Sequence, residues 1–151
     1  MNDDLKTSQE GISLIKSFEG CELSAYRCSA NVPTIGYGHT AGVSDGDTCT
    51  LEEAEEMLTE DLVEFENYVK KYVETDLEQN QFDSLVAWVY NLGPKNLSES
   101  TLLKELNAGN LEEVPRQMKR WNRAGGQVLD GLIRRREAES RLFKGEAWEN
   151  V

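Results

Sequence analysis

Apolar residues at helical spacing mark the first segment of the chain, and they are Ile12, Leu14, Ile15 and Phe18. Intervals of three and four residues place such side chains on one face of a helix. Thr7 and Glu10 have the spacing of a capping box, in which two side chains satisfy the free N–H groups of a helix start. Gly20 readily takes the left-handed conformation found where helices end. The pattern therefore predicts a helix that ends at Glu19.

Helical spacing disappears between residues 21 and 47. Short apolar stretches alternate there with Gly, Asn, Pro and Ser, which predicts a small antiparallel sheet with tight turns. Helical spacing then returns at about 50–72, 76–92, 100–107, 110–121 and 131–143, with a loop at 124–126. Further capping-box patterns begin at Thr50, Asp76 and Asn110.

This order of elements predicts an α+β fold that is mostly helical. A chain of 151 residues is long enough for one well-packed domain. We expect a single domain over 1–151 with two lobes and a cleft between them, because ligands usually bind in clefts. The sheet lobe covers about 20–50, the helical lobe combines 1–19 with 73–151, and a long helix at 50–72 connects them.

Charge is spread unevenly along the chain, whose net charge is −12. Residues 1–80 hold 18 acidic and 5 basic residues, and the rest holds 10 acidic and 11 basic. An acidic half repels nucleic acid and anionic lipid, so we expect no nucleic-acid partner. No apolar stretch approaches the roughly 18 residues that cross a bilayer, which argues against stable membrane insertion. The first residues lack the features of a secretory signal, which predicts synthesis in the cytoplasm of the cell that makes the protein.

The metal-binding residue types are few. The three cysteines form no Cys-x-x-Cys pair, and His39 is the single histidine. This argues against a zinc site, and nothing in the sequence implies another metal or an organic cofactor.

Glu19 is the first candidate for chemistry. A carboxyl at the end of an apolar helix is partly shielded from water, which suits it to donating a proton near neutral pH. A lone glutamate in that position is more often a solvated surface residue, so the residues that follow matter. Cys28 comes nine positions later and Thr34 six after that, and segment 34–40 reads Thr-Ile-Gly-Tyr-Gly-His-Thr.

This segment resembles the active-site region of phage-type lysozymes, glycoside hydrolase family 24. The signature of that family is Glu, eight residues, Asp or Cys, five residues, and Thr, which here falls on Glu19, Cys28 and Thr34. The resemblance extends over about residues 8–145. It includes three later segments, which are 80–85, 90–93 and 131–137.

The resemblance implies a lysozyme-like two-lobed fold and a muramidase. Such an enzyme hydrolyses the β-1,4 bond between N-acetylmuramic acid and N-acetylglucosamine in bacterial peptidoglycan, and phages use it as an endolysin for host-cell lysis. Glu19 would protonate the leaving oxygen. Cys28 and Thr34 would hold the attacking water, so that the product is inverted at the anomeric carbon. The alternative is a relative that binds peptidoglycan but cleaves it weakly.

Cys28 stands where the family more often has Asp. A thiol orients water less well than a carboxylate unless it ionises, and the nearby Glu19 is expected to disfavour the thiolate. The resemblance also implies that Cys21 could pair with Cys28 in an oxidising periplasm and block activity. The other interpretation leaves Cys21 unpaired against the first helix, because cytosolic thiols stay reduced. Cys49 receives no role.

Four other residues receive roles in binding or support, three of them from the resemblance and His39 from its local context. Tyr90 and Asn91 fall where the family lines its cleft, which implies substrate binding, with packing at a helix end as the alternative. Arg135 matches the family arginine that pairs with the catalytic Glu, although a run of arginines is usually a solvated helix face. His39 is expected to form a hydrogen bond inside the sheet or to pair with an acid, rather than to act as a base.

Peptidoglycan is therefore the expected partner of a protein that acts on the cell wall in the periplasm. We expect a monomer. Because no leader is visible, a separate pore-forming protein, a holin, is the simplest route of release.

Overall fold

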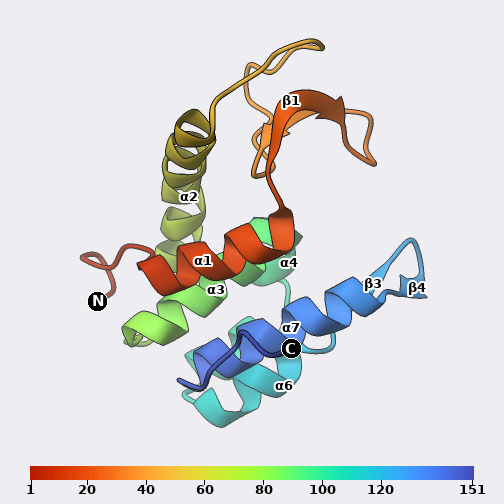
Figure 1. The fold of residues 1–151 in the computed structure, drawn as a ribbon. Coiled ribbons are helices and arrows are strands. Elements are labelled where there is room, and N and C mark those ends of the chain that lie inside the picture. The colour runs from red at the N-terminus through yellow and green to blue at the C-terminus, as the bar shows by residue number, and fades with distance from the viewer. The chain divides into compact units, whose positions relative to one another are not determined.

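The computed structural model describes all 151 residues, and the chain forms two compact units (Figure 1). One unit is continuous, covers residues 15–64 and contains the larger hairpin. The other unit is mainly helical and combines residues 1–14 with 65–151. The predicted class, α+β and mostly α, is confirmed. None of the helices is both long enough and apolar enough to cross a lipid bilayer.

The small sheet of the first unit has two strands, β1 (Glu22–Arg27) and β2 (Pro33–Gly36), which pair antiparallel. Tyr26 lies opposite Thr34 across this pair. The connecting turn contains Asn31 with a φ of 62°, a left-handed conformation that Asn tolerates better than most residues. The predicted antiparallel sheet is therefore present, and its turn places residues 28–32 beside the start of β2.

The long helix α2 (Leu51–Tyr72) begins where the sequence predicted. The backbone N–H of Thr50 donates to Glu53 at 2.9 Å, and the N–H of Glu53 donates to the Thr50 hydroxyl at 3.1 Å, which completes a capping box. Ala54 and Leu58 are buried one turn apart, as an amphipathic pattern requires. Glycine at position 36 allows the close approach of this helix, because a Cβ there would lie 3.3 Å from that of Ala54.

The mainly helical unit is built around α3 (Gln79–Leu92), in which residues 82–89 are all buried. Helix α7 (Asp130–Phe143) packs on α3, and α6 (Val114–Met118) packs on α7. Shorter elements complete the unit, and they are α4 (Pro94–Ser98), α5 (Thr101–Asn107) and the 3-10 helix η1 (Leu111–Glu113). The core of this unit includes Phe82, Leu85, Trp88, Leu102, Leu106 and Met118.

The predicted capping box of the first helix is wrong. Helix α1 (Gln9–Glu19) begins two residues after Thr7. The backbone N–H and hydroxyl of Thr7 both donate to Glu66, at 2.9 and 2.7 Å. Glu10 instead accepts a hydrogen bond from the indole of Trp148 at 2.9 Å. Both side chains are therefore engaged by residues far away in the sequence.

Two later boundaries also differ from prediction. The cap of α3 is Glu78 with Gln81, two positions beyond the expected Asp76. The stretch 110–121 is not one helix, because it divides into η1 and α6, and Asn110 makes no side-chain cap hydrogen bond.

The predicted loop at 124–126 is the turn of a second hairpin. Strand β3 (Arg123–Ala124) pairs with β4 (Gln127–Val128). Gly125 and Gly126 have φ values of 58° and 80°, and two successive left-handed residues suit a tight two-residue turn.

Asp83 anchors the N-terminal segment to α3. Its side chain is almost fully buried. It accepts hydrogen bonds from the backbone N–H of Ser8 at 2.9 Å, from the Ser8 hydroxyl, and from the amide of Gln79 at 2.8 Å. Gly11 lies against it, because a Cβ at that position would approach the Asp83 Cβ to 2.8 Å. The start of α1 is thus fixed by a residue of another helix.

Candidate active site

Glu19 is the last residue of α1 and is half-buried. Gly20, with a φ of 70°, ends the helix as predicted and leads the chain into β1. The pKa of the Tyr26 phenol on β1 indicates which charged groups lie near Glu19. Partial burial raises the pKa of Tyr26, and the negative charges of Glu19, Cys28 and Glu22 raise it further. Glu19 and Cys28 therefore lie within electrostatic reach of one side chain, which the sequence did not single out.

Cys28 and Thr34 converge on one carbonyl group. The backbone N–H of Cys28 donates to the Val32 carbonyl at 3.1 Å, and the Thr34 hydroxyl donates to the same oxygen at 2.8 Å. Thr34 is buried and Cys28 is half-buried. The turn between β1 and β2 thus brings together two of the three residues of the predicted signature.

The pKa of the Cys28 thiol is lower than that of an ordinary cysteine. The main cause is hydrogen bonding to the backbone of Val32, followed by hydrogen bonding to the backbone of Ala30. The sequence led us to expect the opposite direction, because Glu19 disfavours a thiolate. The hydrogen bonds of the turn outweigh the partial burial that would raise this pKa, and they favour the thiolate over the thiol.

The three cysteines are free thiols. Cys21 and Cys28 flank β1, and an extended strand of that length separates its ends by about 20 Å. The Cα atoms of a disulfide lie within about 7 Å of each other. A Cys21–Cys28 bridge stays a prediction, and it would require β1 to come apart. In the folded chain the Cys21 side chain is hydrogen-bonded to Tyr37.

His39 pairs with an acid, which was one of the two alternatives expected from the sequence. Its Nδ1 lies 2.8 Å from the Oδ2 of Asp61 on α2, and both side chains are largely buried. The backbone of His39 also exchanges two hydrogen bonds with Ile35, both 2.9 Å long. These contacts fix the end of β2 to α2.

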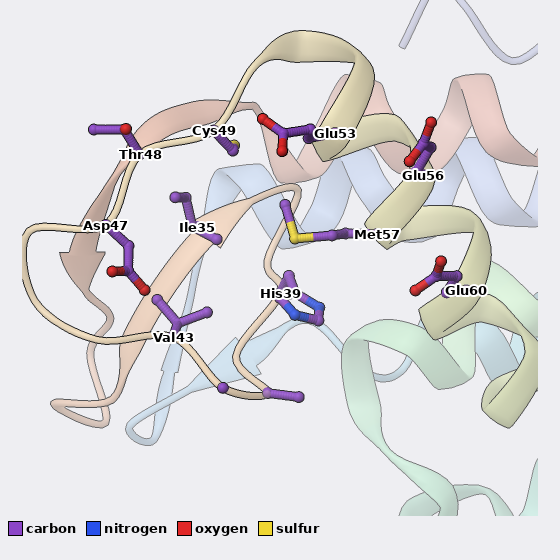
Figure 2. A pocket seen from close by; sticks show the side chains of 12 residues that line it. Ile35, His39, Val43, Asp47, Thr48, Cys49, Glu53, Glu56, Met57 and Glu60 are labelled. Atoms are coloured by element: carbon purple, nitrogen blue, oxygen red, sulfur yellow. The ribbon is translucent and has the colours of Figure 1, made fainter.

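A hollow of about 300 Å³ lies between α2 and residues 41–49 in the same unit (Figure 2). Its apolar part consists of Ile35, Val43 and Met57, and Figure 2 shows His39 beside them. Acidic side chains also line it, and they are Asp47, Glu53, Glu56 and Glu60. None of the three signature residues lines this hollow, so it is separate from the turn that carries Cys28.

Arg135 and Arg136 share one carboxylate in the mainly helical unit. The Nε of Arg135 lies 3.1 Å from Glu139, and the Nε of Arg136 lies 2.8 Å from the other oxygen of the same carboxylate. All three side chains are buried. The alternative of a solvated helix face is therefore wrong for these two arginines and holds only for Arg134, which is exposed. Sequence reasoning missed Glu139, although its spacing from both arginines was a usable signal.

The two predicted substrate-binding residues belong to the same unit and differ in environment. Tyr90 is half-buried and its ring meets that of Phe65 edge-on at 5.0 Å. Asn91 is exposed, and its carbonyl oxygen accepts a hydrogen bond from Arg136 at 2.6 Å. The amide N–H donors of the Asn91 side chain remain available for other hydrogen bonds. No three His, Cys, Asp or Glu side chains are arranged to hold a metal ion.

Comparisons with known proteins agree on one family. The family model described as phage lysozyme matches residues 16–139. The endolysin of Bacillus phage B103 is 43% identical over 97% of this chain and 57% of its own length. The endolysin of Salmonella phage P22 is 37% identical over 92% of this chain and 98% of its own length.

A solved structure, the muramidase domain of SpmX from Asticaccaulis excentricus, matches 92% of this chain and 97% of that one, with 39% identity and a TM-score of 0.87. The chain spans less than three fifths of the length of two Bacillus phage relatives, at 57% and 58%. The matched segment contains all three signature residues, and the chain belongs to the phage lysozyme family.

Proposed function

We propose that this chain is a muramidase that hydrolyses the β-1,4 bond between N-acetylmuramic acid and N-acetylglucosamine in peptidoglycan. The observation that carries the proposal is the grouping within residues 15–64. Glu19 and Cys28 both act on the phenol of Tyr26, and Cys28 and Thr34 share the carbonyl of Val32. The endolysin and muramidase names of the relatives support the same class.

Glu19 acts as the general acid in this proposal. Its proton passes to the glycosidic oxygen as the bond to the anomeric carbon breaks, and positive charge develops on the sugar ring. A half-buried carboxyl suits this task because it is shielded from bulk water yet open to a substrate.

Cys28 and Thr34 hold the water that attacks the anomeric carbon from the other face. The Thr34 hydroxyl already donates its hydrogen to Val32, so its oxygen is left to accept a hydrogen bond from the water. The second hydrogen points at the sulfur of Cys28, whose lowered pKa increases the fraction of thiolate, and a thiolate accepts a hydrogen bond better than a thiol does. The water proton passes to that sulfur as the new bond forms, and the product is inverted.

Three residues of the other unit are proposed to assist. Tyr90 and Asn91 bind the sugar chain, the tyrosine through its ring and the asparagine through its amide N–H donors. Arg135 keeps the supporting role that the family resemblance gives it, with Glu139 holding its guanidinium in place.

At the level of the cell, we propose an endolysin that lyses its host by cutting the wall from the periplasm. It acts as a monomer and depends on a separate holin for release. Hydrolysis of the glycosidic bond uses water as its only co-reactant.

The test compares Glu19→Gln with Glu22→Gln, an exposed neighbour that serves as the matched control. Clearing of a suspension of purified peptidoglycan measures activity. We expect Glu19→Gln to lose about 100-fold to 10,000-fold, as for loss of a general acid, and the control to stay near the parent. A Glu19→Gln variant as active as the parent would sink the mechanism.

Pelleting with insoluble wall separates binding from cleavage. If the parent binds wall without releasing muropeptides, the chain is a weakly cleaving binding relative and the proposal is wrong. Proton NMR of the first product gives the anomeric configuration, and retention would contradict the roles of Cys28 and Thr34.

A further inference from the structure

One segment of this acidic chain carries a net positive charge. Residues 116–136 hold seven basic residues and one acidic residue, a net charge of +6 in a chain whose total is −12. This segment covers the end of α6, the β3–β4 hairpin and the start of α7. The proposed muramidase mechanism uses only one residue of it, Arg135.

Three large apolar side chains are exposed within this segment. Val128, Leu129 and Ile133 are 46%, 42% and 44% exposed. Leu129 and Ile133 are one helical turn apart, because the N–H of Ile133 donates to the carbonyl of Leu129 at 3.0 Å. The hairpin that carries Val128 leads directly into the first turn of α7 (Figure 1). Leu129 and Ile133 therefore lie on one side of the start of α7, and Val128 precedes them at the end of the hairpin.

Basic side chains accompany the apolar ones. Arg123 lies directly opposite Val128 in the hairpin, so the two side chains share one face of it. Arg134 follows Ile133, and its guanidinium reaches back to within 4.0 Å of a Cβ placed on Gly131.

Three cations of this surface form no ion pair, although the carboxylate of Glu99 lines the same hollow as Arg120 and Arg123. Other basic residues nearby are paired, Arg116 with Glu113 and Lys119 with Glu137. Arg120, Arg123 and Arg134 are exposed and have no carboxylate within ion-pair distance. We call the following six residues the basic-apolar patch: Arg120, Arg123, Val128, Leu129, Ile133 and Arg134.

We propose that the basic-apolar patch docks this protein on the surface of an anionic lipid bilayer. Guanidinium groups bind lipid phosphates in pairs of hydrogen bonds, and apolar side chains beside them enter the boundary between headgroups and hydrocarbon. A nucleic acid or an anionic polysaccharide would use the arginines but would leave the three apolar side chains in water. The combination therefore favours lipid over a purely polar polyanion.

The negative charge elsewhere on the chain limits this binding without preventing it. At an ionic strength of 0.1 M, charges farther than about 10 Å from the membrane are largely screened. The patch in direct contact then decides the interaction, and only one orientation of the protein binds. This contact is peripheral and is compatible with the absence of a membrane-spanning helix.

Co-sedimentation with large vesicles tests the proposal. Vesicles of phosphatidylcholine with phosphatidylglycerol are expected to bind the protein, and vesicles of phosphatidylcholine alone are not. Arg123→Gln and Arg134→Gln should each lower the partition coefficient about fivefold. Val128→Ser combined with Ile133→Ser should lower it about tenfold.

Matched controls lie outside the patch. Arg116→Gln removes an exposed but paired arginine, and Val63→Ser removes an exposed apolar side chain on acidic α2. Both should bind vesicles like the parent. Unfolding midpoints and peptidoglycan clearing should stay unchanged in all variants, so this proposal and the muramidase proposal fail separately.

Two results would overturn the proposal. One is no difference in sedimentation between the two kinds of vesicle. The other is binding that depends on the arginines but not on Val128 and Ile133, with equal binding to a soluble polyanion such as heparin, which would make the patch a polyanion site.

Discussion

Replacing Asp83 with alanine tests how firmly the N-terminal segment is held to the mainly helical unit. Asp83 is 1% exposed and accepts three hydrogen bonds, two from Ser8 and one from Gln79. A hydrogen bond to a charged acceptor contributes about 1.5–3 kcal/mol, and the donors of half-buried Ser8 would lose their partner. Water entering the space left by the carboxylate recovers part of this. We expect the free energy of unfolding to fall by about 3–5 kcal/mol.

Urea unfolding measures this loss, and a thermal scan should show a midpoint lowered by about 10 °C for a chain of this size. Asp83→Asn is the matched control, because it keeps the volume and one accepting oxygen while losing the charge. It should lose about half as much. A double-mutant cycle with Ser8→Ala then isolates the coupling between the two residues. A loss below about 1 kcal/mol in Asp83→Ala would refute the assignment of these hydrogen bonds.

Two further predictions concern a close approach and a thiol. Gly11→Ala should destabilise the chain by about 1–3 kcal/mol, because the new Cβ would lie 2.8 Å from that of Asp83. The control Gly131→Ala, in the open first turn of α7, should be neutral or stabilising by up to about 1 kcal/mol in thermal unfolding. Equal effects of the two substitutions would contradict the packing of Gly11 on Asp83. Iodoacetamide should alkylate Cys28 before Cys49, because the pKa of Cys28 is lowered and that of Cys49 is raised, chiefly by burial. In mass mapping across a pH series, the reaction of Cys28 should begin at lower pH, and simultaneous onset would refute the difference.

Residue patterns predicted a helix boundary correctly where that boundary depends only on residues close by in the sequence. The box of Thr50 and Glu53 forms because both partners lie at the exposed start of α2, where nothing else competes for them. Thr7 and Glu10 have the same spacing, but Glu66 and Trp148 bind them instead. A distant partner is invisible to a local pattern, so the prediction failed at that helix start.

The second hairpin escaped prediction for a different reason. Its strands are two residues long, too short to show the alternation of apolar and polar residues that marks a strand. The pair Gly125-Gly126 was the available signal, because two glycines in succession favour a two-residue hairpin turn.

The candidate site was predictable where it follows a contiguous motif. Glu19, Cys28 and Thr34 were named from their spacing, and the turn does join Cys28 to Thr34 through one carbonyl. Tyr26 and Asp61 were not named, because their relevance depends on strand register and on which turn of α2 faces His39. The direction of the Cys28 pKa likewise depends on hydrogen-bond geometry that a sequence does not contain.

The division of the chain into a continuous and a discontinuous unit has a consequence for synthesis on the ribosome. Residues 15–64 form their unit from one continuous stretch of chain, but residues 1–14 belong with 65–151. The bond between Ser8 and Asp83 joins positions 75 residues apart. At about 5–20 residues per second, the first segment waits roughly 4–15 s for that partner. During this interval the apolar face of α1 has no completed core to enter, which makes the newly made N-terminus a natural client for chaperones.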